Sequence, residues 1–420
     1  MAIRIKLATS SKELDDVFNL RYKVYVEERG KFDASSNHNP RIVDHFDAIP
    51  GVVNVIAYSG SEAVAALRLN QDLDIGLPAE YYFDFSDIRK SLEKEYQESE
   101  GGDRKPPCLV SGSMLAVHKD WRNRRNVIFS LFKTAAGVLH DWGATHVICS
   151  ISEDTLSMYG RLGFKTIAES SWNPSVKDRM VPIMASFDQV FEWTFGKIRK
   201  SIDHFWLDNL CGQFERILLS PGEVLFEQND FATHTYAIDE GWVAVSRKDP
   251  EGNEMVLANL SRGALFGELA VFDGERRSAK ASALVNTELL AIERLQLFEI
   301  LKKNPDHLEQ LLRHFAKRVR DTDNLAMIQA FAPQTGRVEY ALNELWRSAI
   351  PDPRRPHQRS IKVGPKQIAR TARVREDEVR KVLEVKKSEN ILDYGENVIK
   401  FFHGPDDGNV PVKAAGESPI

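Results

Sequence analysis

The sequence predicts a multidomain α+β chain: an α/β domain, then a β-roll with a long helix, then a winged helix-turn-helix. Three observations lead to this prediction. Residues 1–190 alternate helical and strand patterns, residues 218–296 form short alternating runs broken by glycines, and short basic helices follow position 351. The 420 residues suffice for about two to four domains. We place the boundaries at 1–190, 191–217 (a connecting helix), 218–332 (β-roll and long helix), 333–403 (winged helix) and 404–420 (a disordered tail).

The composition is that of a globular protein, with 42% hydrophobic and 28% charged residues, which excludes collagen-like, coiled-coil and wholly disordered chains. No run approaches 18 apolar residues and the N-terminus lacks the apolar core of a signal peptide, so we expect a cytoplasmic protein without a membrane partner. Cys108, Cys149 and Cys211 form no CxxC pair, which argues against a disulfide framework. No ligand cluster has metal spacing, so we expect no metal.

Charge is distributed unevenly along the chain. The net charge is −5, but residues 351–403 carry +5 and the remainder −10. A basic C-terminal module on an acidic body favours a polyanionic partner such as duplex DNA, although scattered surface lysines would give the same balance.

The N-terminal domain contains a basic turn that opens an amphipathic helix, and free amides and the helix dipole make such a turn a natural pyrophosphate site. With the strand LAV before the turn and the element YGRLGF after it, residues 109–169 resemble the GNAT acyltransferase fold. The resemblance implies an acyl-CoA or acyl carrier protein as donor and makes Tyr159 the general acid for the leaving thiolate. Arg125 and Val127 replace two glycines of the family's loop. The implied donor-binding residues are Val117, Arg122, Arg124 and Arg125.

Upstream, Arg21, the pair Asp44 and Asp47, and Arg68 follow one another in the order found in N-acyl amino acid synthases and acyl-homoserine lactone synthases, which this region resembles. The resemblance implies that these four catalytic-site residues bind an amino acid or related amine through opposite charges. Ser111 occupies the position of those synthases' carboxylate. Alternatively, the aspartates cap helices and Arg68 lies on a surface strand.

Residues 192–217 place large apolar side chains at helical spacing and predict the connecting helix. The β-roll that follows contains FGELAVFDGERRSAKASA, residues 266–283, in which two glycines, a carboxylate and an Arg-Ser pair could hold a sugar phosphate. Gly267, the amide of Leu269, Arg277 and Ser278 would bind phosphate, and Glu268 would accept from a sugar hydroxyl. A surface ion pair between Arg277 and Glu268 is the alternative.

Residues 215–330 resemble the cyclic-nucleotide-binding domain of the Crp/Fnr family, from SPGEVLFEQND through EGWVAV to the segment just described. The resemblance assigns Glu268 to the ribose, Arg277 and Ser278 to the cyclic phosphate, and Thr322 to the base. Asp323 replaces a serine of the best-known member. Because Asp accepts from adenine and guanine alike, we expect cAMP and leave cGMP open.

The long helix carries a heptad seam that predicts a homodimer through residues 306–330. An ordinary amphipathic helix packed on the roll is the alternative. The seam consists of Leu308, Leu312, Phe315, Val319, Thr322 and Ala326.

Two short helices around a turn near Arg373, followed by the hairpin ILDYGENVIKFF, predict the winged helix-turn-helix, which resembles the DNA-binding end of the same family. Glu376, Asp377 and Lys381 stand where the best-known member has Arg, Glu and Arg, which changes sequence readout. A docking role for this domain is the alternative. The candidate DNA-contacting residues are Arg375, Glu376, Asp377, Arg380 and Lys381.

These features together predict a cyclic-nucleotide-responsive transcription regulator carrying a GNAT-like domain that binds an acyl donor. The alternative is an N-acyltransferase gated by cyclic nucleotide, whose winged helix is structural.

Overall fold

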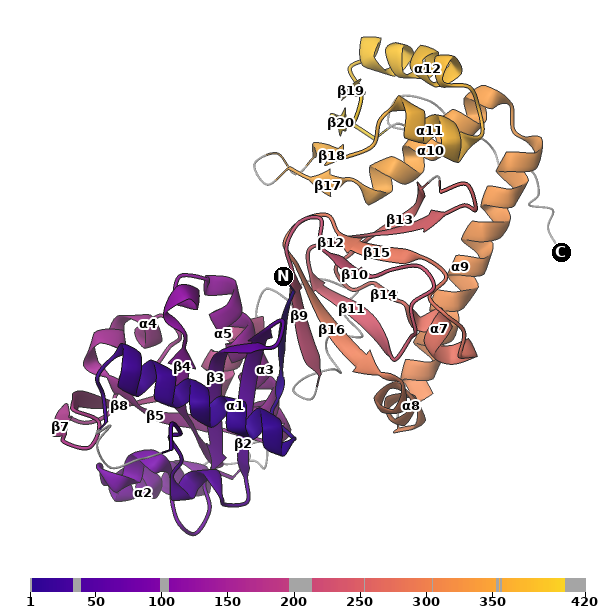
Figure 1. Ribbon diagram of the computed structural model, residues 1–420. Coiled ribbons are helices and arrows are strands. Elements are labelled where there is room, and N and C mark those ends of the chain that lie inside the picture. Colours follow the sequence, from indigo (N-terminus) through magenta and orange to yellow (C-terminus); the bar gives the residue numbers. More distant parts are fainter. Residues whose placement is uncertain are drawn as a thin grey trace. The chain divides into compact units, whose positions relative to one another are not determined.

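The computed structural model describes residues 2–32, 39–98, 106–195, 214–252, 254–303, 305–352, 355 and 357–404 (Figure 1). Its contacts divide the chain into two compact units. The first comprises Met1–Glu223, Tyr236–Glu240 and Asn286–Ile292, and the second comprises Val224–Thr235, Gly241–Val285 and Glu293–Ile420.

A mixed sheet forms the centre of the first unit, in the order β11-β16-β9-β1-β2-β3-β4-β5-β8-β6, with β7 beside β8. β4 and β5 are parallel. β1 pairs on both sides, since Ile5 lies opposite Ala57 of β2 and Arg216 of β9. The strands are β1 (Ile3–Leu7), β2 (Val52–Ser59), β3 (Glu62–Gln71), β4 (Leu109–Val117), β5 (His146–Ser152), β6 (Lys165–Thr166), β7 (Ser171–Asn173), β8 (Asp178–Ser186), β9 (Glu215–Leu219), β11 (His234–Glu240) and β16 (Thr287–Glu293).

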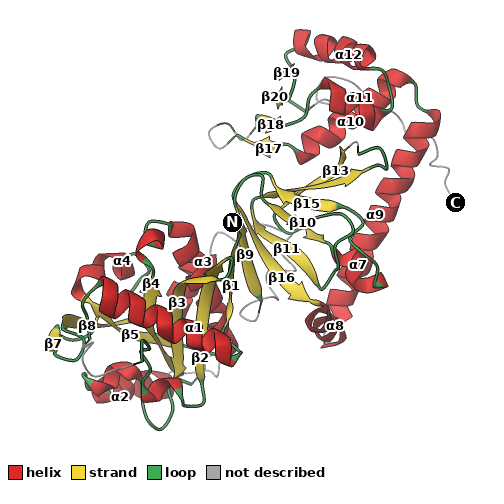
Figure 2. Cartoon of the chain, viewed as in Figure 1, coloured by secondary structure: helices red, strands yellow, loops and turns green. Residues whose placement is uncertain are grey.

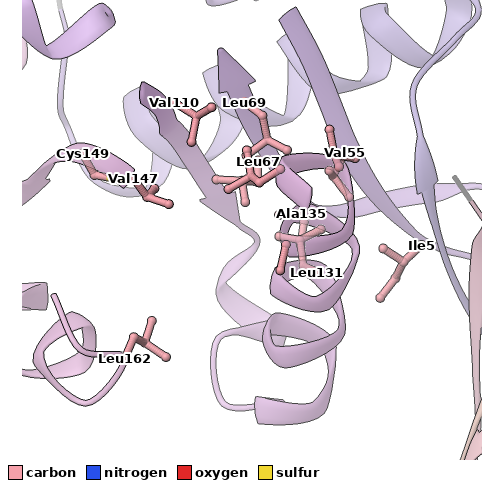
Figure 3. Packing of buried hydrophobic residues seen from close by; sticks show 14 of the residues in the cluster. Ile5, Val55, Leu67, Leu69, Val110, Leu131, Ala135, Val147, Cys149 and Leu162 are labelled. Atoms are coloured by element: carbon pink, nitrogen blue, oxygen red, sulfur yellow. The ribbon is translucent and has the colours of Figure 1, made fainter. Parts of the chain in front are cut away.

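Helices cover both faces of this sheet, so β3 reads as a nearly continuous apolar run instead of an alternating one. The core on one face includes Val17 of α1 and Ala66 of β3. The core on the other face includes Leu131 of α3 and Leu67 of β3 (Figure 3). The helices are α1 (Ser11–Tyr22), α2 (Ser86–Gln97), α3 (Arg125–Asp141), α4 (Leu156–Gly160) and α5 (Phe187–Phe195).

A π-helix over Lys23–Glu28 continues α1 directly. Such wide turns are rare and are frequent near functional sites. The phenol of Tyr25 on this turn donates to the Leu115 carbonyl of β4 over 2.9 Å, which ties the π-helix to the central strands.

Four buried charges form a cluster inside the first unit, which we call the ionic quartet: Lys133 of α3, Arg216 of β9, Asp239 of β11 and Glu288 of β16. The Lys133 ammonium donates to Asp239 over 3.0 Å and to Glu288 over 2.9 Å. The Arg216 guanidinium donates to the same carboxylates over 2.6 and 2.7 Å. Each side chain is at most 7% exposed, so two cations and two anions balance one another away from water.

The predicted connecting helix over 191–217 is wrong at its C-terminal end. α5 covers its first residues and ends at Phe195, residues 196–213 lie outside the described part, and β9 begins at Glu215. Strand pairing decides the structure there, because Ile217 lies opposite Arg4 of β1 and Leu289 of β16.

The second unit contains the antiparallel sheet β10-β15-β12-β13 and the long helix α9 (Figure 2). α9 places Phe315 against Phe272 of α7, with ring centroids 5.8 Å apart. The elements are β10 (Val224–Phe226), β12 (Trp242–Lys248), β13 (Glu254–Ser261), β14 (Leu265–Phe266), α7 (Glu268–Asp273), β15 (Lys280–Ala283), α8 (Arg294–Lys303) and α9 (Pro305–Phe331).

The C-terminal part of the second unit packs three helices on the small sheet β17-β18-β20-β19. Val338, Ile368, Val379, Leu383 and Phe401 meet in its core. The elements are α10 (Gln334–Ser348), β17 (Ile350–Pro351), β18 (Arg359–Ile361), α11 (Pro365–Ala372), α12 (Glu376–Ser388), β19 (Leu392–Tyr394) and β20 (Ile399–Phe401). The predicted multidomain architecture of an α/β domain and a β-roll is confirmed.

Candidate functional site

The predicted phosphate cradle is assembled in the second unit around Gly267, which precedes α7 with φ of +72°, a value that favours glycine. The Arg277 guanidinium donates to the carbonyls of Gly267 and His234, each over 2.6 Å. It also lies 4.2 Å from the centroid of the Phe226 ring. These contacts fix the cation beside the glycine turn.

The other cradle residues lie next to this pair. Glu268 and Arg277 are 0% and 4% exposed, so a surface ion pair between them does not fit the structure. Leu269 directly follows Glu268 in the sequence, and Ser278 directly follows Arg277. Both Leu269 and Ser278 are exposed. The structure thus brings together the residues that the sequence assigns to phosphate and ribose.

The residues predicted to meet the base lie on α9. Asp323 is exposed on this helix, and the side chain of Thr322 lies outside the described part. Leu312 and Val319 of the heptad seam are 58% and 59% exposed in the single chain. Phe315, another seam residue, instead packs against Phe272 of the same chain, so this position of the seam already has a partner within the chain.

α11 and α12 form two helices joined by a turn in which Arg373 adopts the left-handed conformation, with φ of +50°. The cations predicted to contact DNA all form ion pairs with acidic side chains. Arg375 binds Asp377, Arg380 binds Glu376 and Glu396, and Lys381 binds Glu378, over distances of 2.6 to 3.0 Å. Exposed pairs of this kind are weak and can exchange for phosphates.

The first unit contains a pocket of about 810 Å³ near the C-terminal end of β5. Tyr159 lines it, and burial raises the pKa of this phenol well above its usual range. Tyr159 therefore keeps its proton at neutral pH, which is the state that a general acid requires. Ser111 also lines the pocket and is 1% exposed.

Arg21, Asp44, Asp47 and Arg68, which the resemblance assigns to one amine-binding site, form ion pairs with one another. Arg21 donates to both Asp47 oxygens over 2.9 and 3.0 Å and to Asn54 over 2.5 Å. Arg68 donates to Asp44 over 2.6 Å and lies 3.0 Å from Asp47.

Only part of this network reaches the pocket. The side chains of Arg21 and Asp47 are 0% and 2% exposed and do not line it, whereas Asp44 and Arg68 do. Asp44 also caps the 3-10 helix His45–Asp47, as the capping alternative predicts. Arg68 is 1% exposed, so a surface position for it is wrong.

The predicted donor-binding residues surround the start of α3. Arg124 and Arg125 are exposed, and Arg124 stacks 4.2 Å from the Trp121 ring centroid. Val117 is buried. Arg122 donates to the Val117 carbonyl over 3.1 Å and forms an ion pair with Glu28, so its charge is already balanced.

Sequence reasoning missed a polar cluster in the pocket wall, formed by Lys31, Ser152 and Asp178. Lys31 follows the π-helix, Ser152 ends β5 and Asp178 begins β8. It also missed Glu28. No local pattern identifies these residues, because the partners of Lys31 and Glu28 lie more than 90 positions away and even Ser152 and Asp178 are 26 positions apart.

Within the described ranges, no group of three His, Cys, Asp or Glu side chains could hold a metal ion. Cys108 and Cys149 are free thiols, and Cys211 lies outside those ranges. In the same part of the chain, helices that combine the length and the apolarity needed to cross a bilayer are absent.

Comparison with known proteins shows that two regions of the chain match two different families. Residues 16–186 match the family model of the N-acyl amino acid synthase FeeM, and residues 216–304 match that of the cyclic nucleotide-binding domain. The cyclic AMP receptor protein of Thermus thermophilus is 33% identical over 34% of this chain and 67% of its own length. The cAMP-activated global transcriptional regulator CRP of Salmonella typhimurium is 30% identical over 42% of this chain and 85% of its own. The solved structure of FeeM from uncultured soil microbes is 16% identical, covering 46% of this chain and 94% of its own, with a TM-score of 0.36.

Proposed function

Because the chain belongs to the Crp family of cyclic-nucleotide-binding regulators and has an N-acyl amino acid synthase domain before the family's β-roll, we propose that it is a cyclic-nucleotide-responsive transcription regulator whose N-terminal domain binds an acyl donor. The effector is cAMP, with cGMP as the alternative. The DNA-bound form is a homodimer through residues 306–330.

The buried Arg277 beside the Gly267 turn is the observation that carries this proposal. A buried guanidinium fixed by two backbone carbonyls is positioned for an anion before the ligand arrives, so binding costs little reorganisation. The buried carboxylate of Glu268 next to it suits the ribose hydroxyl of a cyclic nucleotide.

Selection of random duplex DNA by the full-length protein, with and without cAMP at physiological salt, tests the regulator function. We expect enrichment of a two-fold symmetric site only with cAMP. R277A should weaken cAMP binding by about 10- to 100-fold, the usual value of a charge-assisted hydrogen bond, and should abolish the enrichment. R276A is the matched control, because the exposed Arg276 stacks on Phe231. Equal enrichment without ligand would contradict the proposal.

The ion pairs formed by the cations of α12 and by Arg375 before it, together with the pocket around Tyr159, favour a second function, an N-acyltransferase gated by cyclic nucleotide. In its reaction the amine nitrogen attacks the thioester carbonyl and the carbon–sulfur bond breaks. The leaving sulfur takes the proton of the Tyr159 phenol, the nitrogen releases one proton to water as the amide forms, and water returns a proton to the Tyr159 phenolate. The exposed Arg124 and Arg125 bind the donor's phosphate.

Release of free thiol from acyl-CoA and acyl-carrier-protein donors, in the presence of amino acid acceptors, measures this activity. We expect cAMP to raise the rate and Y159F to lower kcat about 100-fold, the typical contribution of a general acid. Y58F is the control, because Tyr58 bonds Asp16 and does not line the pocket. A rate that cAMP leaves unchanged would exclude gating.

A further inference from the structure

Lys31, Ser152 and Asp178 form a polar cluster in the wall of the acyltransferase pocket, which we call the Lys31 cluster. The Lys31 ammonium donates to Ser152 Oγ over 3.0 Å and forms an ion pair with Asp178. Ser152 also donates to Asp178. The three residues come from different elements, so the fold holds the lysine from two sides.

The cluster has access to the pocket without being a surface ion pair. The side chains of Lys31 and Asp178 are 16% and 22% exposed, and both line the same pocket as Tyr159. Partial burial of a charged pair costs solvation energy. A salt bridge on the open surface would not bear this cost. A ligand group in the pocket can therefore meet Lys31 directly.

An ammonium group has three N–H donors, and Lys31 uses two of them for Ser152 and Asp178. Among the residues that the structure describes, no acceptor takes the third. Arg29, two positions earlier, is exposed, lines the same pocket and has no ion-pair partner in the described ranges. This wall thus offers positive charge and a free donor.

The network around Arg68 has no comparable N–H donor for a ligand. Its guanidinium is 1% exposed and bound by two carboxylates, so the incoming group would have to displace Asp44 or Asp47. Compared with Arg68, Lys31 is the cation of the pocket wall that keeps a spare donor.

We propose that Lys31 is the residue that recognises the acceptor of the acyl transfer by binding its carboxylate, with Ser152 and Asp178 as positioning residues. Lys31 then makes the site select an amino acid with a free carboxylate over the lactone or the amide of the same amine. This inference rests on the acyltransferase function proposed above.

Initial rates of acyl transfer test it, with the full-length protein, cAMP, and a panel of acyl-CoA and acyl-carrier-protein donors. The acceptors are the twenty common L-amino acids, the carboxamide of the best one, and homoserine lactone. In the wild type we expect the acid to be preferred over its amide. K31M should raise KM for the acid about 10- to 100-fold, with a smaller change in kcat, because a charge-assisted hydrogen bond is lost. KM for the amide should stay unchanged, and K31R should recover most of the preference.

K23M is the matched control, because Lys23 is a half-buried lysine of the preceding π-helix, and neither it nor its partner Glu62 lines the pocket. If the Lys31 cluster had a purely structural role, K31M would have a lower melting temperature, and its kcat would fall for the acid and the amide alike. Equal use of acid and amide by the wild type, or equal effects of K31M and K23M, would overturn the proposal.

A binding measurement separates this proposal from the proposed activity. Saturation-transfer NMR of the amino acid panel needs no turnover. If no donor reacts but the wild type binds an amino acid that K31M does not, the acyltransferase function fails and the recognition site stands. If the wild type shows no amino acid signal, or K31M shows the same signal, the recognition site is refuted.

Discussion

Removing one member of the ionic quartet should destabilise the first unit strongly. K133M leaves Asp239 and Glu288 facing Arg216 alone, so one buried carboxylate has no counter-charge. Breaking a buried ion pair on one side costs about 3–5 kcal/mol, which is the loss we expect in the free energy of unfolding. The double variant K133M/E288Q keeps the Arg216–Asp239 contact of 2.6 Å and restores the charge balance. It should recover about half of that loss, within the usual range of coupling between contacting residues.

Urea denaturation of the full-length protein, followed by circular dichroism and tryptophan fluorescence, measures these differences. K12M is the control, because the Lys12 side chain is 80% exposed in its pair with Asp16, and it should change stability by less than about 0.5 kcal/mol. The reasoning would be refuted if K133M cost no more than K12M, or if the double variant were less stable than K133M.

The pH dependence of the free energy of unfolding is a second test of the ionic quartet. Burial alone would raise the pKa of Asp239, but Arg216 and Lys133 outweigh it and lower this pKa to about 2. Because the folded pKa lies below the unfolded one, the contribution is complete above about pH 4 and disappears as the pH falls toward 2. Without Lys133 the folded pKa of Asp239 should lie closer to the unfolded value, so this pH-dependent contribution to stability should be smaller.

Three further predictions concern other parts of the chain. G267A forces a Cβ into a left-handed turn with φ of +72°, which should cost about 1 kcal/mol and weaken cAMP binding in calorimetry; unchanged affinity would contradict the cradle. Burial raises the pKa of the Cys149 thiol to about 12, so iodoacetamide at pH 8 should leave it unmodified in folded protein, as mass spectrometry would detect. D377N frees Arg375 from its carboxylate partner and should steepen the salt dependence of DNA binding, log K against log salt, by about 0.9; an unchanged slope would mean that Arg375 contacts no phosphate.

The sequence predicts best the features whose signal is local. The glycine turn at Gly267 and the Arg-Ser pair lie within a dozen residues of one another. The multidomain architecture follows from such patterns and is confirmed. The roles of the candidate site residues stay predictions.

The features that the sequence does not reveal depend on contacts between distant segments. Lys133 occupies a helix position where a lysine normally faces solvent, and only β11 and β16, more than 100 positions later, supply its carboxylates. Lys31 and Asp178 are separated by 147 positions. Conversely, Arg21 and Asp47 have the right chemistry for a substrate but neutralise one another in the interior, which no spacing rule can foresee.

The place of β1 in its sheet has a consequence for biosynthesis. β1 is translated before the other strands of this sheet, yet one of its two neighbours is β9, some 210 residues later. Until β9 has been translated, one edge of β1 carries unpaired amides and carbonyls that invite association with other nascent chains. Expression should therefore suffer more from slow translation or truncation before position 219 than from shortening the C-terminus, and an affinity tag fused directly before Ile3 would crowd the centre of the sheet.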